Sequence, residues 1–239
     1  MALTFFLASF FGILPIIFWL IFFLWQDFKK PEPLKWLLLT FLVGVIITPL
    51  VWLLENYFLN LFGISFQNTP TLFQLIIAYF GIATIEEGAK FFGTAFLMKK
   101  NRYFNEAIDA MIYLIVLALG FGLVENILAA SQEIQSSTLI LPILEIMSLR
   151  FIGANLLHAL SSGFLGFCWA QALLKRQRKY LLLGFVLSVS LHAFFNLAII
   201  KFGSLAVLLV SGILFIVGIF LLWAFDLLKK IKKPLKYSL

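Results

Sequence analysis

The sequence has little charge and almost no cysteine. Only 12% of its 239 residues are charged and 63% are hydrophobic, whereas a soluble domain has about a quarter charged residues. So little charge excludes a soluble globular protein. The single cysteine, Cys168, excludes an internal disulfide framework and a cysteine-based metal cluster.

Long apolar runs fill most of the chain instead. Several reach the roughly 20 residues that a helix needs to cross a bilayer, which predicts an all-α, polytopic transmembrane helical bundle. We expect about seven spans, or eight if an apolar segment near 138–149 also crosses. Because no basic residue precedes Leu3, we expect the first span to remain in the mature protein. The predicted spans are 3–25, 36–54, 72–98, 107–130, 152–174, 180–200 and 203–225.

The segment near 138–149 is too short for an ordinary span. Pro142 and Glu145 interrupt it, and a run of about 10 to 14 apolar residues is typical of an interfacial or re-entrant segment. We predict that it lies on the outer side. Residues 1–239 are expected to form one integral membrane domain, with a motif-bearing core at 72–200 and a cytoplasmic lysine-rich tail at 226–239.

The net charge of +7 comes from basic residues in alternate connections and the tail. Since lysine and arginine gather on the cytoplasmic side, we predict a multi-pass plasma-membrane protein with its amino terminus outside and its carboxyl terminus in the cytoplasm. The positive charge then reflects topology and indicates no nucleic-acid partner. The four clusters are Lys29, Lys30 and Lys35; Lys99, Lys100 and Arg102; Lys175, Arg176, Arg178 and Lys179; and Lys229, Lys230, Lys232, Lys233 and Lys236.

Four ionisable residues stand out within the predicted spans: Glu86, Glu87, Lys90 and Glu125. Each costs roughly 2.5 to 3.5 kcal/mol at the centre of a membrane helix, so they must face one another, water or an ion. Glu86 and Lys90 are four residues apart and share a helix face. Two simpler readings stay open: a glutamate–lysine pair that joins helices, and a Glu125 that snorkels at the outer membrane surface.

Both histidines lie on polar helix stripes. One stripe contains Asn155, His158, Ser161 and Ser162, and the other contains Ser188, His192 and Asn196. A single buried histidine is often only a hydrogen-bonding group, but two such stripes indicate one shared site.

Glutamates and imidazoles in an apolar pocket favour hydrolysis by water that a glutamate activates. Cys168 is ten positions from His158, about 15 Å along the same helix, which disfavours a Cys–His pair. Glu125, His158 and His192 could form a His₂Glu zinc site with Glu86 as the base. A metal-free mechanism uses the same residues, and ligand types alone do not decide between the two.

Four motifs in order on successive spans resemble the PrsW family of intramembrane proteases, which is related to the CAAX prenyl proteases and the Abi immunity proteins. The wider group usually has EExxxR and FxxxH motifs. Here Lys90 comes one residue early and Glu125 replaces the histidine, which matches PrsW better than the prenyl proteases. The motifs are Glu86-Glu87-x-x-Lys90, Phe121-x-x-x-Glu125-Asn126, His158-Ala159-Leu160-Ser161 and His192-x-x-x-Asn196.

This resemblance implies an intramembrane endopeptidase that cleaves a membrane-anchored protein, typically an anti-sigma factor, on its extracytoplasmic side. Its implied partners are that substrate and the lipid bilayer. Two other hypotheses remain: a proton- or cation-coupled transporter that uses the charged residues as a relay, and a catalytically silent immunity or scaffold protein. The predicted catalytic residues are Glu86, Glu87, Lys90, Glu125, Asn126, His158, His192 and Asn196.

Overall fold

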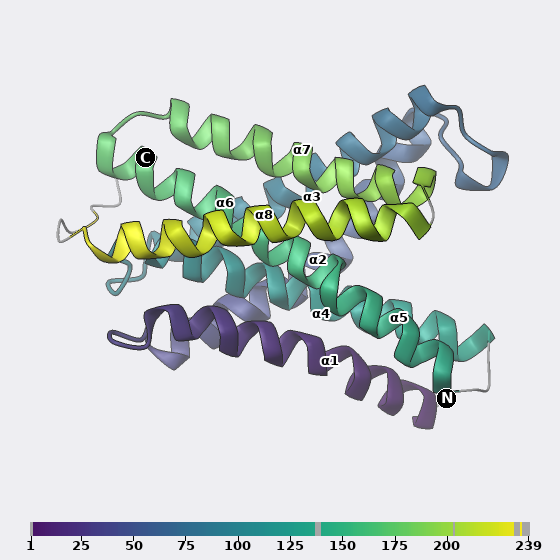
Figure 1. Cartoon of the computed structure of the whole chain (residues 1–239), viewed down its shortest axis with the longest axis horizontal. Coiled ribbons are helices and arrows are strands. Elements are labelled where there is room, and N and C mark those ends of the chain that lie inside the picture. Colours follow the sequence, from purple (N-terminus) through teal and green to yellow (C-terminus); the bar gives the residue numbers. More distant parts are fainter. Residues whose placement is uncertain (1, 137–139, 203, 232–234, 236–239) are drawn as a thin grey trace.

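The computed structural model describes residues 2–136, 140–202, 204–231 and 235, and this part of the chain is a bundle of helices without β-strands (Figure 1). The all-α prediction is therefore confirmed. The helices are α1 Ala2–Leu24, α2 Leu34–Leu61, α3 Leu72–Met98, α4 Asp109–Ser136, α5 Ile140–Ile152, α6 Ala154–Lys175, α7 Lys179–Phe202 and α8 Ser204–Lys229, with short 3-10 turns at Trp25–Asp27 and Phe66–Asn68.

Seven membrane-crossing segments are present among the described residues, as predicted. Helix α5 has 13 residues and is about 20 Å long, too short to cross a hydrocarbon core of about 30 Å. It corresponds to the short segment expected near 138–149, of which Thr138 and Leu139 lie outside the described residues. A bend at Gly153 joins α5 to α6.

Three helices run further than the apolar runs suggest. Helix α2 continues to Leu61, α4 to Ser136 and α5 to Ile152, because backbone hydrogen bonds continue where the side chains turn polar. Helix α8 likewise reaches Lys229, inside the segment predicted as a tail. These extensions place Glu55 and Arg150 on helices, whereas their sequence context suggested connecting loops.

Helix α4 forms the centre of the bundle. Its residues 110–119 are at most 2% exposed, and the helix packs against α1, α2, α3, α5 and α6. Two glycines bring α2 and α4 into backbone contact: a Cβ at Gly44 would lie 2.1 Å from the Leu117 carbonyl oxygen, and one at Gly120 would lie 2.2 Å from that of Phe41. The two helices can therefore pack this closely only with glycine at both positions.

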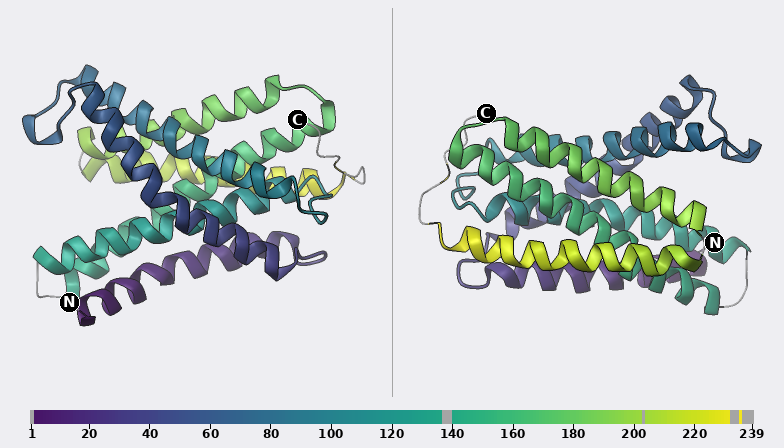
Figure 2. Two further views of the ribbon diagram at one scale, coloured as in Figure 1. Left: turned by 180° about the vertical axis from the view of Figure 1, so that it is seen from behind. Right: turned by 45° about the horizontal axis from the view of Figure 1, so that its top comes forward.

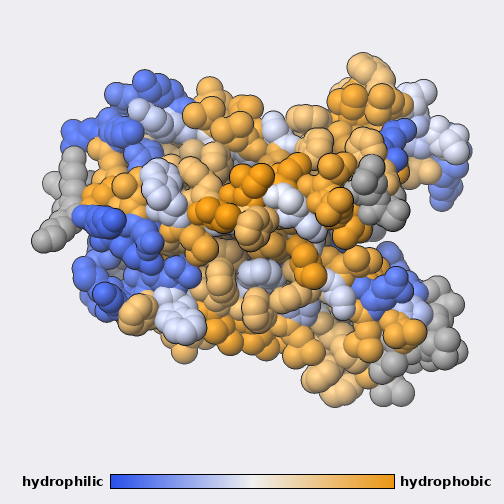
Figure 3. Space-filling view, viewed as in Figure 1, coloured by the Kyte–Doolittle hydropathy of each residue, from blue (hydrophilic) through white to orange (hydrophobic). Residues whose placement is uncertain are grey.

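The outer surface is apolar between two more hydrophilic ends (Figure 3). Large side chains such as Phe92, Phe96 and Phe215 are more than 60% exposed, as expected for residues that face lipid. The α1–α2, α3–α4 and α6–α7 connections and the end of α8 lie together at one end of the bundle (Figures 1 and 2). The described residues of the basic clusters thus share one side, whereas Lys232, Lys233 and Lys236 lie outside the described residues. The cytoplasmic orientation of this side stays a prediction.

Candidate active site

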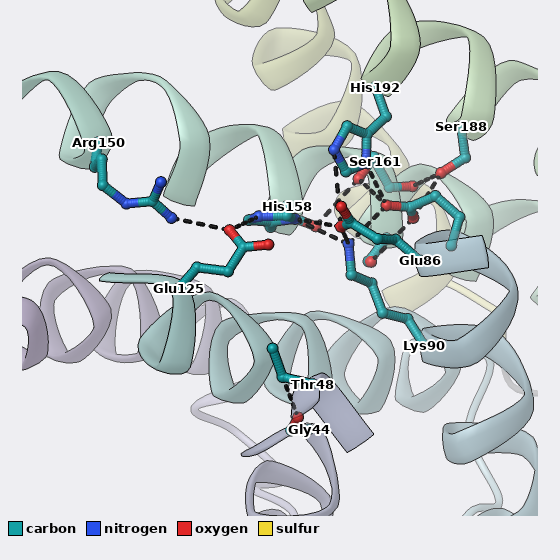
Figure 4. A network of polar contacts seen from close by, with 12 residues as sticks. Gly44, Thr48, Glu86, Lys90, Glu125, Arg150, His158, Ser161, Ser188 and His192 are labelled. Carbon is teal, nitrogen blue, oxygen red and sulfur yellow. Dashed lines mark hydrogen bonds and ion pairs between the residues drawn. The ribbon is translucent and has the colours of Figure 1, made fainter. Parts of the chain in front are cut away.

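The α3 motif lies inside the bundle and faces α6 and α7 (Figure 4). The Lys90 side chain is fully buried, and its Nζ lies 3.0 Å from Glu86 Oε2 and 2.9 Å from Glu87 Oε1. The same Nζ is 2.9 Å from Nδ1 of His158 on α6 and 4.6 Å from the centre of the Phe121 ring on α4. Lys90 thus joins the first three sequence motifs at one point.

Glu87 is completely enclosed and joins three helices. His192 Nδ1 lies 2.9 Å from Glu87 Oε1, and the Ser188 hydroxyl donates to Oε2 at 3.0 Å. Ser161 and Ser162 donate longer bonds of 3.3 and 3.5 Å. Both carboxylate oxygens are therefore occupied by donors from α3, α6 and α7.

Glu86 has a different environment from its neighbour. Its Oε2 accepts from Lys90 and lies 3.8 Å from His192 Nε2 and 3.9 Å from His158 Nδ1. Glu86 also lines a cavity of about 480 Å³ between the helices, whereas Glu87 does not. The two adjacent acids thus have different surroundings: Glu87 is enclosed by donors, and Glu86 faces the cavity.

Glu125 belongs to a second polar group that extends the first. Its Oε2 lies 2.9 Å from His158 Nε2 and 2.9 Å from Nη2 of Arg150 on α5. Arg150 Nε also donates to Asn126 Oδ1 at 2.6 Å, and Asn126 Nδ2 donates to the Gly12 carbonyl of α1 at 2.9 Å. Glu125 therefore faces polar partners inside the protein, which removes the reading of a snorkelling acid.

The predicted site residues do not all reach the cavity. Three of them lie behind the residues that line the cavity and form hydrogen bonds to neighbouring polar groups. These three are Glu87, Lys90 and Asn126. The remaining predicted residues line the cavity, together with Arg150 and apolar side chains from α5 to α8. These lining residues are Glu86, Glu125, His158, His192 and Asn196.

Two further residues at the site were not predicted from the sequence. Arg150 falls between the short segment near 138–149 and the span predicted from residue 152, and its signal in the sequence was an arginine in a segment with few basic residues. Glu55 of α2 has a buried Oε1 with no hydrogen-bond partner among the described residues, and its carboxyl interacts electrostatically with Glu86. In the sequence, Glu55 could have been noticed as an acid that directly follows an apolar run.

A set of possible metal ligands is also present. One ligand atom from each of Glu86, Glu87, His158 and His192 lies within 4.8 Å of the others, and imidazole with carboxylate is a donor set that suits zinc and related metals. The predicted set contained Glu125, which is not a member of this cluster. Lys90 donates to three of the four groups, so a metal ion would compete with its ammonium.

Buried glutamates and histidines thus gather around one cavity between helices long and apolar enough to cross a membrane. The sequence profile described as "PrsW family intramembrane metalloprotease" matches residues 32–224. The chain therefore belongs to the PrsW family of intramembrane proteases.

Named relatives agree with this assignment. "Protease PrsW" of Clostridioides difficile (strain 630) is 27% identical over 229 residues, which cover 95% of this chain and 91% of the relative. "Protease PrsW" of Geobacillus kaustophilus (strain HTA426) is 28% identical over 188 residues, 77% of this chain and 76% of the relative. No solved structure matches the chain. These comparisons favour a protease over the cation-coupled transporter.

Proposed function

We propose that this protein cleaves a membrane-anchored protein with a water molecule that Glu86 activates. The observation that carries this assignment is the contrast between adjacent acids. Glu87 has both oxygens occupied by donors and lies outside the cavity lining, whereas Glu86 faces the cavity beside both histidines. Glu86 is therefore the acid with room for a water and a peptide bond.

The other polar groups have positioning or stabilising roles. Lys90 compensates the charge of the two adjacent acids and orients the Glu86 carboxylate. His192 and Asn196 line the cavity next to Glu86, where an N–H from either side chain would stabilise the oxyanion that forms on the scissile carbonyl. His158 lies between Lys90 and Glu125, which engage both of its ring nitrogens, so its role is to position these groups beside the cavity.

A metal, if bound, would be held by Glu86, Glu87, His158 and His192. It would polarise the scissile carbonyl and lower the pKa of a coordinated water. The family description as a metalloprotease and the donor set support this addition. With a metal bound, Glu86 would be one of its ligands, while Lys90, Glu125 and Arg150 would keep their positions around the cluster.

The substrate is proposed from the walls and the location of the cavity. Its lining combines the catalytic groups with apolar side chains such as Leu149, Ile152 and Val207, which suit a segment that leaves a lipid bilayer. These residues belong to α5 and to the start of α8, and these two elements lie on the side of the bundle away from the basic clusters (Figure 1). With the predicted orientation, the cavity opens toward the extracytoplasmic side. An anti-sigma factor is the substrate that the family resemblance suggests.

The test is cleavage of a membrane-anchored substrate by the purified protein in liposomes. Glu86→Gln removes the base, and we expect the rate to fall by about 10² to 10⁴-fold. Glu145→Gln is the matched control, because Glu145 is exposed on α5 and should leave the rate unchanged. Undiminished cleavage by Glu86→Gln would show that another residue activates the water.

A further inference from the structure

A second group of acids lies at the opposite end of α4 from Glu125. It consists of Asp27 at the end of the 3-10 turn after α1, Glu32 in the α1–α2 connection and Asp109 at the start of α4. One carboxylate oxygen from each lies within 4.8 Å of the others. The 16 residues from Asp109 to Glu125 span about 24 Å of helix, so this group is separate from the candidate active site.

Asp109 is the best-defined member of this acidic triad, as we call Asp27, Glu32 and Asp109. The residue is 0% exposed. Its Oδ2 accepts the backbone N–H groups of Asn105 and Glu106 at 2.8 and 2.7 Å. Its Oδ1 is buried and has no hydrogen-bond partner among the described residues. One oxygen thus holds the α3–α4 connection, and the other has no donor at a place where two more carboxylates converge.

The other two acids are held close to Asp109. Asp27 is 8% exposed, and its Oδ2 is also buried without a hydrogen-bond partner in the described part of the chain. Glu32 accepts a hydrogen bond from the hydroxyl of Tyr113, one turn further along α4 than Asp109. Pro31 and Pro33 flank Glu32 and restrict the backbone on both sides of it.

The positive charges nearby are engaged elsewhere. Lys30 forms an ion pair with Glu106, and Lys229 pairs with Asp226 at 3.3 Å. Of the basic side chains that the structure describes, none forms an ion pair with the triad. Burial raises the pKa of the Glu32 carboxyl, and the negative charge of Glu106 adds to this effect.

From these contacts we infer that the acidic triad binds a hard divalent cation of the Ca²⁺ and Mg²⁺ class. All three ligands are carboxylate oxygens, which these ions prefer, whereas zinc and copper favour nitrogen or sulfur. Ligands on opposite sides of a Ca²⁺ ion are about 4.6 to 5.2 Å apart, so oxygens within 4.8 Å of one another can share one ion. Water completes the coordination.

The cation would connect two segments that are far apart in the sequence, residues 27–32 and the first turn of α4. It would hold the end of α1 and the α1–α2 connection against the first turn of α4, which is the central helix of the bundle. Cation binding should therefore stabilise the folded protein, and its effect is independent of the proteolytic reaction.

The experiment uses the full chain in detergent micelles, stripped with a chelator and returned to chelator-free buffer. We expect Ca²⁺, Mg²⁺ or both to raise the Tm in a saturable way, by about 5 to 10 °C at a hundredfold excess over Kd. Separate titrations with each ion show which one the site prefers. Asp27→Asn should abolish this rise, while Asp226→Asn, the same change at an acid outside the triad, should retain it.

A direct binding measurement keeps the inference testable even if Asp27→Asn fails to fold. Tb³⁺ is a luminescent substitute for Ca²⁺, and Tyr113 beside Glu32 can sensitise it. We expect Ca²⁺ or Mg²⁺ to displace bound Tb³⁺ from the wild type, and Glu32→Gln to weaken Tb³⁺ binding at least tenfold. Two results would overturn the inference: a wild-type Tm that neither ion changes, and ion effects of equal size in the wild type and in Asp27→Asn.

Discussion

Nζ of Lys90 lies 2.9 Å from Nδ1 of His158, and this contact determines the protonation of the histidine ring. A lysine ammonium can donate hydrogen bonds but cannot accept them, so Nδ1 must be the acceptor and the ring proton must reside on Nε2. Nε2 in turn donates to Glu125 at 2.9 Å. The three charged motifs of the sequence are thus connected by one directed chain of hydrogen bonds from α3 through α6 to α4.

Removal of the Lys90 charge tests this connection. Lys90→Met would leave Glu86 and Glu87 in the interior without their shared cation, and the loss of one partner from a buried ion pair costs about 3 to 5 kcal/mol. We expect a much lower Tm in detergent micelles. Lys201→Met changes an exposed lysine at the end of α7 and should leave the Tm unaffected. A Lys90→Met protein as stable as the wild type would show that the ammonium does not hold these acids.

The enclosed Glu87 should behave differently from Glu86. In Glu87→Gln, an amide N–H₂ replaces an oxygen that now accepts from several donors, and the mismatch of donors should destabilise the fold by about 1 to 3 kcal/mol. Glu86→Gln should lower activity with little change in Tm. Thermal unfolding and cleavage assays on both variants separate the roles. A stable, inactive Glu87→Gln beside an unstable Glu86→Gln would reverse the assignment.

Sequence patterns predicted the spans well because the bilayer imposes a simple rule of length and polarity. They also identified Glu86, Lys90, Glu125 and both histidines, since a charged or polar group within an apolar run is costly and must find a partner. They did not predict Arg150, which comes from a segment that appeared to be a connection. The pairing of Arg150 with Glu125 depends on how α5 packs against α4, and no periodicity within one helix contains that information.

The role of Asn126 illustrates the same limit. Its place next to Glu125 predicted a catalytic residue, and catalysis is still untested for it. In the structure its amide connects Arg150 to the carbonyl of Gly12 and lies behind the cavity lining. The different surroundings of Glu86 and Glu87 could likewise not be predicted from the sequence, because they depend on which helices cover each carboxylate.

Arg150 should affect catalysis through Glu125 and His158. We expect Arg150→Gln to lower kcat/KM by about 10 to 100-fold, the range found for groups that orient a functional histidine from behind. Arg150→Lys keeps the charge but cannot make both contacts, to Glu125 and to Asn126, so it should restore activity only in part. Lys201→Gln is the control for loss of a basic residue at this end of the bundle. An unchanged kcat/KM in Arg150→Gln would exclude this positioning role.

The set of possible metal ligands predicts which variants should lose a bound metal ion. If Glu86, Glu87, His158 and His192 hold the ion, elemental analysis should find about one equivalent in the wild type and little in His192→Ala or Glu87→Gln. Glu125→Gln should retain the metal, because Glu125 lies outside the cluster. Loss of metal from Glu125→Gln would favour instead the His₂Glu set predicted from the sequence. Full activity in chelator-treated, metal-free protein would exclude a catalytic metal.

The crossing of α2 and α4 gives a prediction about folding that is independent of catalysis. In Gly44→Ala the new methyl group would lie 2.1 Å from the Leu117 carbonyl oxygen, so the two helices must separate, and such overpacking typically costs about 1 to 3 kcal/mol. Gly212→Ala is the matched control, because a Cβ there has no atom within 4 Å and alanine favours a helix more than glycine does. Thermal unfolding should show a lower Tm for Gly44→Ala and an equal or higher one for Gly212→Ala. Equal Tm values for the two variants would mean that the helices are not in backbone contact at Gly44, and the position of α4 relative to α2 would then need revision.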